Sequence, residues 1–462
     1  MRRDILPENE WAVREFEGAD LGDKRREERL VKVAAEVARV KSGIMAQVFS
    51  EKRDLKAAYR LLAEEDVTHE DVIRPHVAET RRICREAGTY LLIEDTTALD
   101  FSARENVEGL GYIGDGRGRG INVHTTLAAR VADWGEHEEP RVVLCGMFGQ
   151  RRWVRKREPI GRGESERSRL SRERESERWA AAFSEIEKPP SDCRLVYIAD
   201  RESDIYEVFS RCENKGVNYV IRASHRRALA DEDGSVFDAV AESSLLGCFE
   251  LRLRSRPGVK ARIARIEVRS TSVTLRGPWR PGGWLGPRTL NVVEAREANA
   301  PRGVKPIHWV LLTDLPRASF KDALRVIRTY SRRWLIEEYH KVLKTGLGME
   351  DSQLSTVERI TALLGILAVT AVRLLNMKLL VEAAPDGIVC ADDFGVEALE
   401  LLSARFGKPK GGWNNRAVFV AIARLGGFLA RKGDGLPGWQ RIWRGYQRFL
   451  DMLEGFEIAR HL

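Results

Sequence analysis

The spacing of apolar residues predicts helices at the start of the chain. Between residues 1 and about 70, apolar side chains recur at intervals near 3.6, as at Leu30, Val33 and Val37, behind a charged run at 23–29. This pattern is typical of helices that pack on one face and expose the other. Three apolar runs separated by glycine-rich turns then predict neighbouring antiparallel strands, at 89–101, 120–132 and 140–150.

The middle of the chain alternates between strand and helix patterns. An apolar run at 194–200, a helical pattern at 204–216 and a second apolar run at 217–224 predict strands that pair in parallel. From about 228 to 318, polar and apolar residues alternate with period two, which predicts a mostly β insertion. From residue 320 almost to the end the pattern is helical, and 320–344 is expected to form one long helix.

Two stretches of the C-terminal part are notably apolar. The run at 360–372 has 13 residues, short of the roughly 20 that a membrane span needs, so it predicts a buried helix. The last predicted helix carries a wide apolar stripe, which suits either a dimer interface or burial within the same chain. The stripe consists of Trp439, Ile442, Trp443, Tyr446, Phe449, Leu450 and Leu453.

Composition and charge narrow the class of protein. The 462 residues, 43% of them hydrophobic, suffice for two or three globular domains. Because 77 Lys and Arg outnumber 69 Asp and Glu, the net charge is +8, which makes a polyanionic partner plausible without requiring one. The densest charge lies at 151–178, where a loop and a solvated helix are expected. No apolar segment follows the first basic residues, so a cytoplasmic protein is predicted.

The cysteines predict neither a zinc site nor a disulfide framework. They are scattered, with no Cys-x2-Cys motif and no Cys/His spacing of the kind that binds zinc. The six are Cys84, Cys145, Cys193, Cys212, Cys248 and Cys390.

Three acidic residues are candidates for a common site. Asp95 and Asp200 each come at the end of an apolar strand core, although an Asp in such a place is often only a cap or turn former. Glu337 lies in the stretch 330–344, "YSRRWLIEEYHKVLK". At about 100° per residue, a continuous helix there would align it with Tyr330, Arg333 and Lys344 within roughly 60°. An exposed face of ion pairs is the simpler interpretation of that stripe.

The predicted order of elements brings these acids together. A mixed sheet of antiparallel strands, strand–helix units and a following helix gathers the three carboxylates at one sheet edge. Oxygen-only ligands suit Mg²⁺ or Mn²⁺ rather than zinc. Two such ions would stabilise the attacking and leaving oxygens of a phosphodiester displacement. Arg333 and Lys344 are then placed to contact phosphates.

The stretch at 330–344 resembles the Tyr-x2-Arg-x3-Glu-x6-Lys signature of bacterial cut-and-paste DDE transposases, specifically the Tn-five-like members of the insertion-sequence-four group. Further resemblances follow in the family's order along nearly the whole chain. They are "WAVREFEGADLGDKRREERLVKVAAEVA", "LLIEDTTALDF", "DRESDIYE", "IHWVLLT" and "AIARLGGF".

The resemblance implies an α/β fold with an RNase H-like catalytic core, that is, a mixed sheet with flanking helices, carrying the mostly β insertion at about 228–318. It implies a helical DNA-end-binding domain at 1–70, the catalytic domain at 71–385 and a helical dimerisation domain at 386–462. Asp95, Asp200 and Glu337 would be the catalytic metal ligands, holding two Mg²⁺ ions that Mn²⁺ can replace.

The resemblance also implies roles for neighbouring residues. Tyr330, Arg333 and Lys344 would hold the terminal phosphate, and Lys341 would contact the end DNA. Trp309 resembles the aromatic that stacks on a base flipped out during hairpin formation, although alone it suits a core position in an alternating strand. Arg222 would support the hairpin, or is simply solvated.

The basic run near the N-terminus resembles the family's end-recognition region. Basic residues that face DNA give affinity a steep dependence on salt, whereas a solvated helix face has the same composition. The candidates are Lys24, Arg25, Arg26 and Arg29.

We therefore expect a transposase that binds double-stranded transposon ends as a synaptic homodimer, cuts them by metal-dependent hydrolysis and transesterification through a hairpin, and joins the 3′-hydroxyls to target DNA. No membrane and no nucleotide cofactor are expected, and the protein would act on the nucleoid of a bacterial cytoplasm. The alternative is a catalytically silent end-binding regulator, and a third possibility is a general metal-dependent nuclease. The complete set of Asp95, Asp200, Glu337 and Lys344 favours the transposase, since three unneutralised carboxylates would repel DNA.

Overall fold

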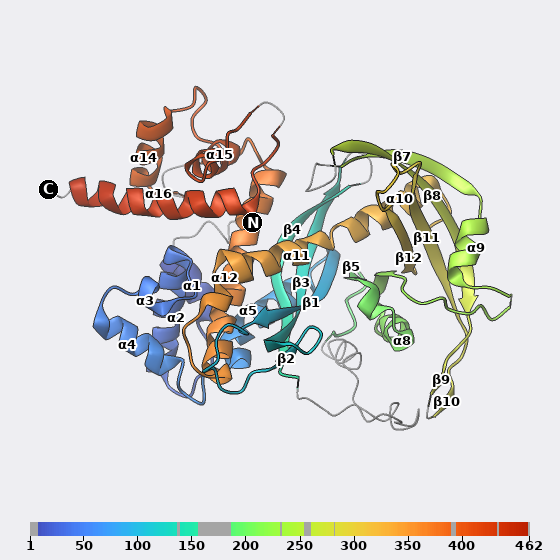
Figure 1. Cartoon of the computed structure of the whole chain (residues 1–462), viewed down its shortest axis with the longest axis horizontal. Helices are drawn as coiled ribbons and strands as arrows, with labels where there is room; N and C mark the ends of the chain where they lie inside the picture. Colours follow the sequence, from blue (N-terminus) through green and yellow to red (C-terminus); the bar gives the residue numbers. More distant parts are fainter. Residues whose placement is uncertain are drawn as a thin grey trace.

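The computed structural model describes residues 8–135, 139–155, 186–231, 233–253, 260–280, 282–389, 394–431 and 434–460 (Figure 1). The first part is helical, as expected. Its helices are α1 (Glu8–Phe16), α2 (Lys24–Val40), α3 (Met45–Val48), α4 (Lys52–Leu61) and α5 (His69–Ile83). Helix α2 begins because Asp23 caps it: its carboxylate accepts a hydrogen bond from the Arg25 amide at 2.8 Å. Its apolar face is buried, including Leu30, Val33 and Val37.

A twisted mixed sheet forms the centre of the molecule (Figure 1). In the described part of the chain it has ten strands, in the order β2-β3-β1-β5-β6-β12-β11-β8-β7, with β4 paired to β3. The strands are β1 (Gly88–Asp100), β2 (Gly111–Ile113), β3 (Gly118–Trp134), β4 (Pro140–Trp153), β5 (Cys193–Ala199), β6 (Asn218–Arg222), β7 (Leu245–Leu253), β8 (Arg262–Leu275), β11 (Arg288–Ala298) and β12 (His308–Thr313). A separate two-stranded hairpin joins β9 (Trp279–Arg280) to β10 (Gly283–Trp284).

Strand pairing agrees with the predicted pattern. β1, β3 and β4 are antiparallel neighbours, and β1, β5 and β6 are paired in parallel. The register of β1 and β5 sets Ile93 opposite Ile198, and continuing it by two residues brings Asp95 beside Asp200. The strands predicted between 228 and 318 extend the same sheet, because β12 pairs with β6.

Helices cover both faces of the sheet. Apolar residues of α12, α10 and α11 form one core with the N-terminal helices, and α8 and α9 cover the other face. The helices and short turns after the first five are α8 (Tyr206–Lys215), α9 (Val236–Glu242), α10 (Phe320–Ser331), α11 (Trp334–Lys341), α12 (Val357–Ala383), α14 (Val396–Phe406), α15 (Asn415–Leu425), α16 (Trp439–Arg460), η3 (Arg201–Ser203), η4 (Val342–Gly346) and η5 (Met349–Asp351).

Helix α12 is the buried helix that the run at 360–372 predicts. Between Val357 and Leu379 it is long and apolar enough to cross a membrane, yet 94% of its most apolar window is buried inside the protein. Such burial is typical of the core helix of a globular protein, and it accounts for the apolar composition.

The prediction of one continuous helix over 320–344 is wrong, because the segment forms two helices separated by a turn. Helix α10 ends at Ser331, a turn follows at Arg332 and Arg333, and α11 begins at Trp334. Over this turn the amides bond three residues back rather than four, as from Arg333 to Tyr330 at 2.9 Å. Because such bonds wind the backbone more tightly, and η4 then opens into a π-helical turn, the stripe does not follow a uniform 100° step.

The C-terminal helices form their own small core. α14, α15 and α16 pack together, with Phe449 and Leu402 buried between them. Ile442 and Phe449 of the predicted stripe are buried within the chain, whereas Tyr446, Leu450 and Leu453 are only partly buried. The side chains of Trp439 and Trp443 lie outside the described residues, so both interpretations of the stripe stay predictions. The predicted charged segment at 151–178 lies largely outside the described residues, and the domain boundaries stay predictions.

Candidate active site

Asp95 and Asp200 lie side by side on neighbouring parallel strands. One oxygen of each is engaged by nearby backbone: Asp95 Oδ1 accepts from the Thr96 amide and Asp200 Oδ1 from the Glu202 amide, both at 2.8 Å. Asp200 thereby caps η3. The capping role that the sequence left open is thus present for Asp200, whereas Asp95 lies within β1, which continues to Asp100.

Glu337 approaches from α11, which packs across β1. The guanidinium of Arg333 lies between the two elements: its Nη1 is 3.1 Å from Asp95 Oδ2, and its Nη2 pairs with Glu337 Oε1. Burial raises the pKa of Asp95 to about 6; the charges of Asp200 and Glu337 add to the rise, and Arg333 opposes it. The three carboxylates therefore interact electrostatically at one site.

The donor set fits a hard divalent cation, provided that Arg333 moves. All the donors are carboxylate oxygens, the ligands that Mg²⁺ and Mn²⁺ prefer. As the side chains stand, however, no group of three His, Cys, Asp or Glu in the described ranges is arranged to hold a metal ion. The Arg333 guanidinium lies between two of the carboxylates that would have to converge.

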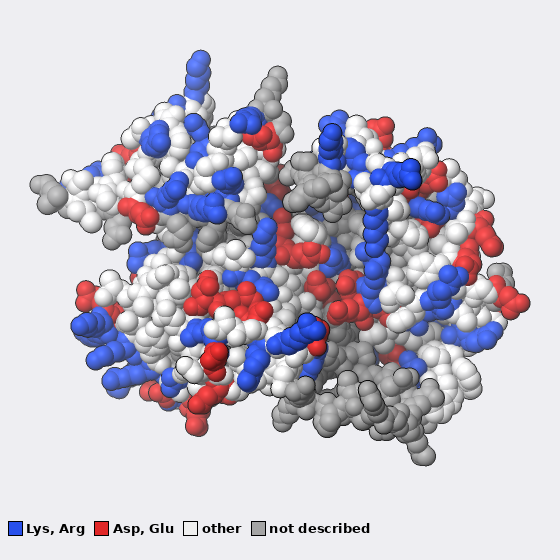
Figure 2. Space-filling model, viewed as in Figure 1, with Lys and Arg blue, Asp and Glu red and all other residues white. Residues whose placement is uncertain are grey.

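Acidic side chains dominate the surface here. Figure 2 shows Asp and Glu gathered in the middle of the face, over the place where Figure 1 shows α11 and β1, with Lys and Arg on either side. An acidic centre between basic flanks suits a polyanion whose backbone is held at the edges and met by cations in the middle.

An aromatic contact joins the signature to β12. Trp309 meets Tyr330 edge to face, with ring centroids 5.1 Å apart. Tyr330 is buried, which raises its pKa, and the charges of Arg333 and Arg222 oppose that rise. Arg222 also donates to the His308 carbonyl at 2.9 Å. The structure thus brings Trp309, Tyr330 and Arg222 close together, and the roles that the resemblance implies for them stay predictions.

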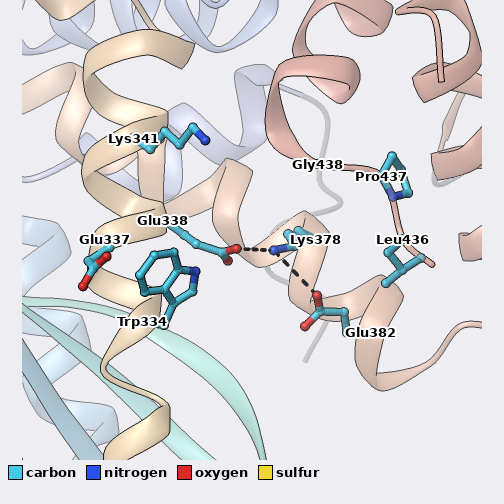
Figure 3. Close-up of a pocket in the computed structure, with 9 residues that line it drawn as sticks. All are labelled: Trp334, Glu337, Glu338, Lys341, Lys378, Glu382, Leu436, Pro437 and Gly438. Atoms are coloured by element: carbon cyan, nitrogen blue, oxygen red, sulfur yellow. Dashed lines mark hydrogen bonds and ion pairs between the residues drawn. The ribbon is translucent and has the colours of Figure 1, made fainter. Parts of the chain in front are cut away.

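Lys341, at the end of α11, and Lys344, in the π-helical turn η4 that follows it, lie in different environments. Lys344 donates to the Ala98 carbonyl of β1 at 2.8 Å and pairs with Glu350 at 3.0 Å, so it is fixed against the strand that carries Asp95. Lys341 instead lines a pocket of about 500 Å³ between α11 and α12, which Glu337 and Glu338 also line (Figure 3).

Figure 3 shows that the adjacent residues Glu337 and Glu338 point to opposite sides of α11. Glu338 turns towards Lys378 of α12, with its Oε1 2.5 Å from the ammonium, and Lys378 also meets Glu382 at 3.7 Å. This ion pair holds α11 to α12, whereas Glu337 pairs with Arg333 in the turn before its own helix.

Sequence reasoning missed two side chains near the site. Trp334 is 60% exposed on α11 and lines the same pocket as Glu337, although its apolar neighbours suggested packing. Arg201 directly follows Asp200 and lines a second pocket, of about 330 Å³, with Arg222, Ser224 and His308. The only signal for Arg201 was its place after a strand-end acid.

A buried hydrogen-bond network around Glu94, the residue before Asp95, supports the site. Glu94 is 1% exposed, and its carboxylate accepts from Ser203 of η3 at 3.2 Å and lies 3.3 Å from His124 Nε2 of β3. These bonds tie β1 to β3 and to the turn after Asp200, so both strand acids are fixed relative to one another.

The N-terminal candidates divide into two pairs. Lys24 and Arg25 are exposed at the start of α2. Arg26 and Arg29 form ion pairs inside the N-terminal part, Arg26 with Asp66 at 2.7 Å and Arg29 with Asp54 at 3.0 Å. Their partners are Glu64, Asp66 and Asp54. Arg26 and Arg29 thus already hold α2 to neighbouring segments.

The fold and the site together define an RNase H-like enzyme that processes nucleic acid. Three family models match the chain in succession: transposase DNA-binding over 8–67, transposase DDE domain over 176–373 and transposase Tn5 dimerisation domain over 373–462. The chain therefore belongs to the Tn5-like DDE transposases, with a DNA-binding part and a dimerisation part. Asp200 and Glu337 lie within the DDE match and Asp95 lies before it; the matches identify domains, so the roles of single residues stay predictions.

Proposed function

We propose that the protein binds the inverted terminal ends of a mobile element, excises the element and joins its 3′-hydroxyl ends to target DNA. The observation that supports this most is the meeting of Asp95, Asp200 and Glu337 from three separate elements, beside Arg333. A binding module has no use for a partly buried set of like charges that repels DNA.

In this proposal the three carboxylates would hold Mg²⁺, or Mn²⁺ in its place, as two ions per site. When bound, the ions would activate the attacking hydroxyl and stabilise the leaving oxygen. The fixed backbone bonds of Asp95 and Asp200 preset two of the ligands, which reduces the rearrangement needed for catalysis.

The basic residues of the signature would position the scissile strand. Arg333 presents a planar fork that matches a phosphate, and Lys344 offers a point charge beside β1. Lys341 would contact the end DNA from the other side of α11. These contacts fix the register of the strand and leave base reading to other residues.

The aromatic cluster would accept an extruded base. Excision without loss of the element end requires that both strands be cut at one site. A first hydrolysis would leave a 3′-hydroxyl, which attacks the opposite strand to form a hairpin and release the flank. A second hydrolysis would open the hairpin and free the 3′-hydroxyl again for joining to target DNA. Trp309, supported by Tyr330 and with Arg222 beside it, offers the stacking surface that such a base needs.

The end domains would recognise and pair the two ends. Lys24 and Arg25, exposed at the start of α2, are the better placed of the basic candidates for phosphate contact. We take 1–70, 71–385 and 386–462 as the end-binding, catalytic and dimerisation domains. Each subunit would hold one end, and the synaptic dimer would act on the nucleoid in the bacterial cytoplasm.

The test is strand cleavage of a labelled duplex that carries the terminal repeats bordering the gene. The repeat duplex and a scrambled duplex are incubated with the protein, with and without Mg²⁺ or Mn²⁺. Metal-dependent nicking at the repeat boundary supports the proposal. Binding without cleavage identifies an end-binding regulator, and equal cleavage of both duplexes identifies a general nuclease.

A further inference from the structure

The cationic group between Asp95 and Glu337 belongs to the protein itself. Arg333 contacts both carboxylates and is only 17% exposed, so its charge is largely withdrawn from water. Asp95 Oδ1 is already engaged by the Thr96 amide, so the oxygen that Arg333 contacts, Oδ2, is the one through which Asp95 would have to bind another cation.

We propose that Arg333 acts as a latch that takes the place of the metal until DNA arrives. Its guanidinium offsets part of the negative charge of Asp95 and Glu337 while no ion is bound, and it must leave these oxygens before a divalent cation can bind them. The inference rests on the proposed function, because the ion and the DNA end are those of the proposed reaction.

The geometry supplies a reason for the latch. Carboxylates that approach one another in a partly buried site repel, and removing charge from water adds to the cost. A guanidinium offsets part of both effects, although the pKa of Asp95 stays raised. Because Arg333 lies in the turn between α10 and α11, its side chain can swing without unwinding either helix.

The DNA end supplies the place to which Arg333 moves. A phosphate accepts two parallel hydrogen bonds from a guanidinium, as a carboxylate does. Once Arg333 turns to a phosphate, Asp95 and Glu337 are released for the ion. DNA and metal therefore displace the same pair of contacts, and each is expected to raise the affinity of the other by the same factor.

A purely structural Arg333 predicts the opposite. If its bonds only hold Asp95 and Glu337 in the geometry that the ion needs, removing the guanidinium misplaces the ligands and weakens metal binding. The latch predicts stronger metal binding, because a competing cation has been removed. The sign of the change in metal affinity separates the two roles.

The experiment measures Mn²⁺ binding to the full chain without DNA at pH 8, by the paramagnetic resonance signal of free Mn²⁺. Arg333→Ala and Arg333→Gln are compared with the unmodified protein, and Arg332→Ala, which removes the neighbouring arginine that pairs with Glu139, is the matched control. We expect Mn²⁺ to bind both Arg333 variants about tenfold more tightly, within the usual range for coupled sites, and the control to match the unmodified protein. Unchanged or weaker binding in both folded Arg333 variants overturns the latch.

A second arm tests the coupling to DNA. The affinity for a precleaved end duplex is measured by fluorescence anisotropy with and without Mn²⁺. The latch predicts that Mn²⁺ strengthens DNA binding more in the unmodified protein than in Arg333→Gln; equal enhancement contradicts it.

A third variant tests the metal site itself. Glu337→Gln should weaken Mn²⁺ binding, and Mn²⁺ binding that Glu337→Gln leaves intact would overturn both the latch and the proposed metal site. Failure of the latch alone leaves end-specific cleavage intact, so the two claims are distinguishable.

Discussion

Trp309 of β12 packs edge to face against Tyr330 at the end of α10, with an angle of 72° between the ring planes. The contact joins a strand of the central sheet to the helix that leads into the signature. Since the charge of Arg222 of β6 also acts on the Tyr330 hydroxyl, three elements meet around one partly exposed indole.

Replacing Trp309 is expected to affect the later cleavage steps selectively. Trp309→Ala should slow hairpin formation or opening about tenfold or more, because stacking of a base on an aromatic is worth about 1–3 kcal/mol, while the first nick proceeds as before. Nicked, hairpin and fully cut products are resolved on denaturing gels over time.

Trp309→Phe and Tyr330→Phe are the controls. Trp309→Phe keeps an aromatic face and should retain most hairpin formation. Tyr330→Phe keeps the contact between the rings but removes the hydroxyl on which the charge of Arg222 acts. Normal double-strand release by Trp309→Ala would count against the stacking role.

The raised pKa of Asp95 predicts a pH-dependent cost to stability. A carboxyl whose pKa rises from 3.8 to about 6 on folding binds its proton more tightly in the folded state, so ionisation destabilises the protein. That cost is absent below about pH 4 and complete above about pH 6. In EDTA, Asp95→Asn should therefore gain stability relative to the unmodified protein between pH 4 and pH 7, measured by thermal unfolding. A relative loss over that range would show that the Arg333 pair outweighs burial.

The crossing of α15 and α16 depends on Gly445. A Cβ there would come within 1.8 Å of the Ile422 carbonyl oxygen, so Gly445→Ala should push the helices apart and destabilise the C-terminal domain by about 3 kcal/mol or more. Gly455→Ala in the same helix meets nothing within 4 Å and should stabilise it by about 0.5–1 kcal/mol. Calorimetry measures the free energy of unfolding of each variant, and light scattering measures how much of it forms a dimer on the end duplex. Similar effects of the two changes would contradict the close crossing.

The two pairs of N-terminal basic residues should respond differently. The double change Lys24→Ala and Arg25→Ala should weaken binding of the end duplex and reduce the slope of log affinity against log salt by about 0.9 for each phosphate that the protein no longer neutralises. Arg26→Ala removes the pairing to Glu64 and Asp66, so its effect should fall on unfolding of the domain. An unchanged salt slope in the double variant would show that Lys24 and Arg25 do not bind phosphates of the end duplex.

Much of the fold follows from local pattern. The apolar cores of β1 and β5 and the acid after each of them predict a carboxylate at the end of each core, because side-chain alternation is a local rule. That the two strands are neighbours follows only from the predicted order of elements. The buried helix α12 is likewise evident from its composition alone.

The remainder depends on contacts between distant segments. Arg333 and Asp95 are 238 residues apart, so no local pattern shows that the guanidinium joins two of the predicted metal ligands. The partners of Arg26 are also remote in sequence, 38 and 40 residues away. The break between α10 and α11 was missed because neither glycine nor proline marks it; packing of Tyr330 and Arg333 into the site accounts for the tightened turn.

The most direct test of the account compares two adjacent glutamates. Glu337→Gln and Glu338→Gln make the same chemical change on one helix, but Glu337 faces Asp95 through Arg333 whereas Glu338 pairs with Lys378 (Figure 3). With the terminal-repeat duplex and Mg²⁺, we predict that Glu337→Gln abolishes nicking while still binding the duplex, and that Glu338→Gln cuts at a rate within about tenfold of the unmodified protein, with a loss of stability of about 1–3 kcal/mol. Cleavage by Glu337→Gln at the unmodified rate would contradict the assignment of the active site.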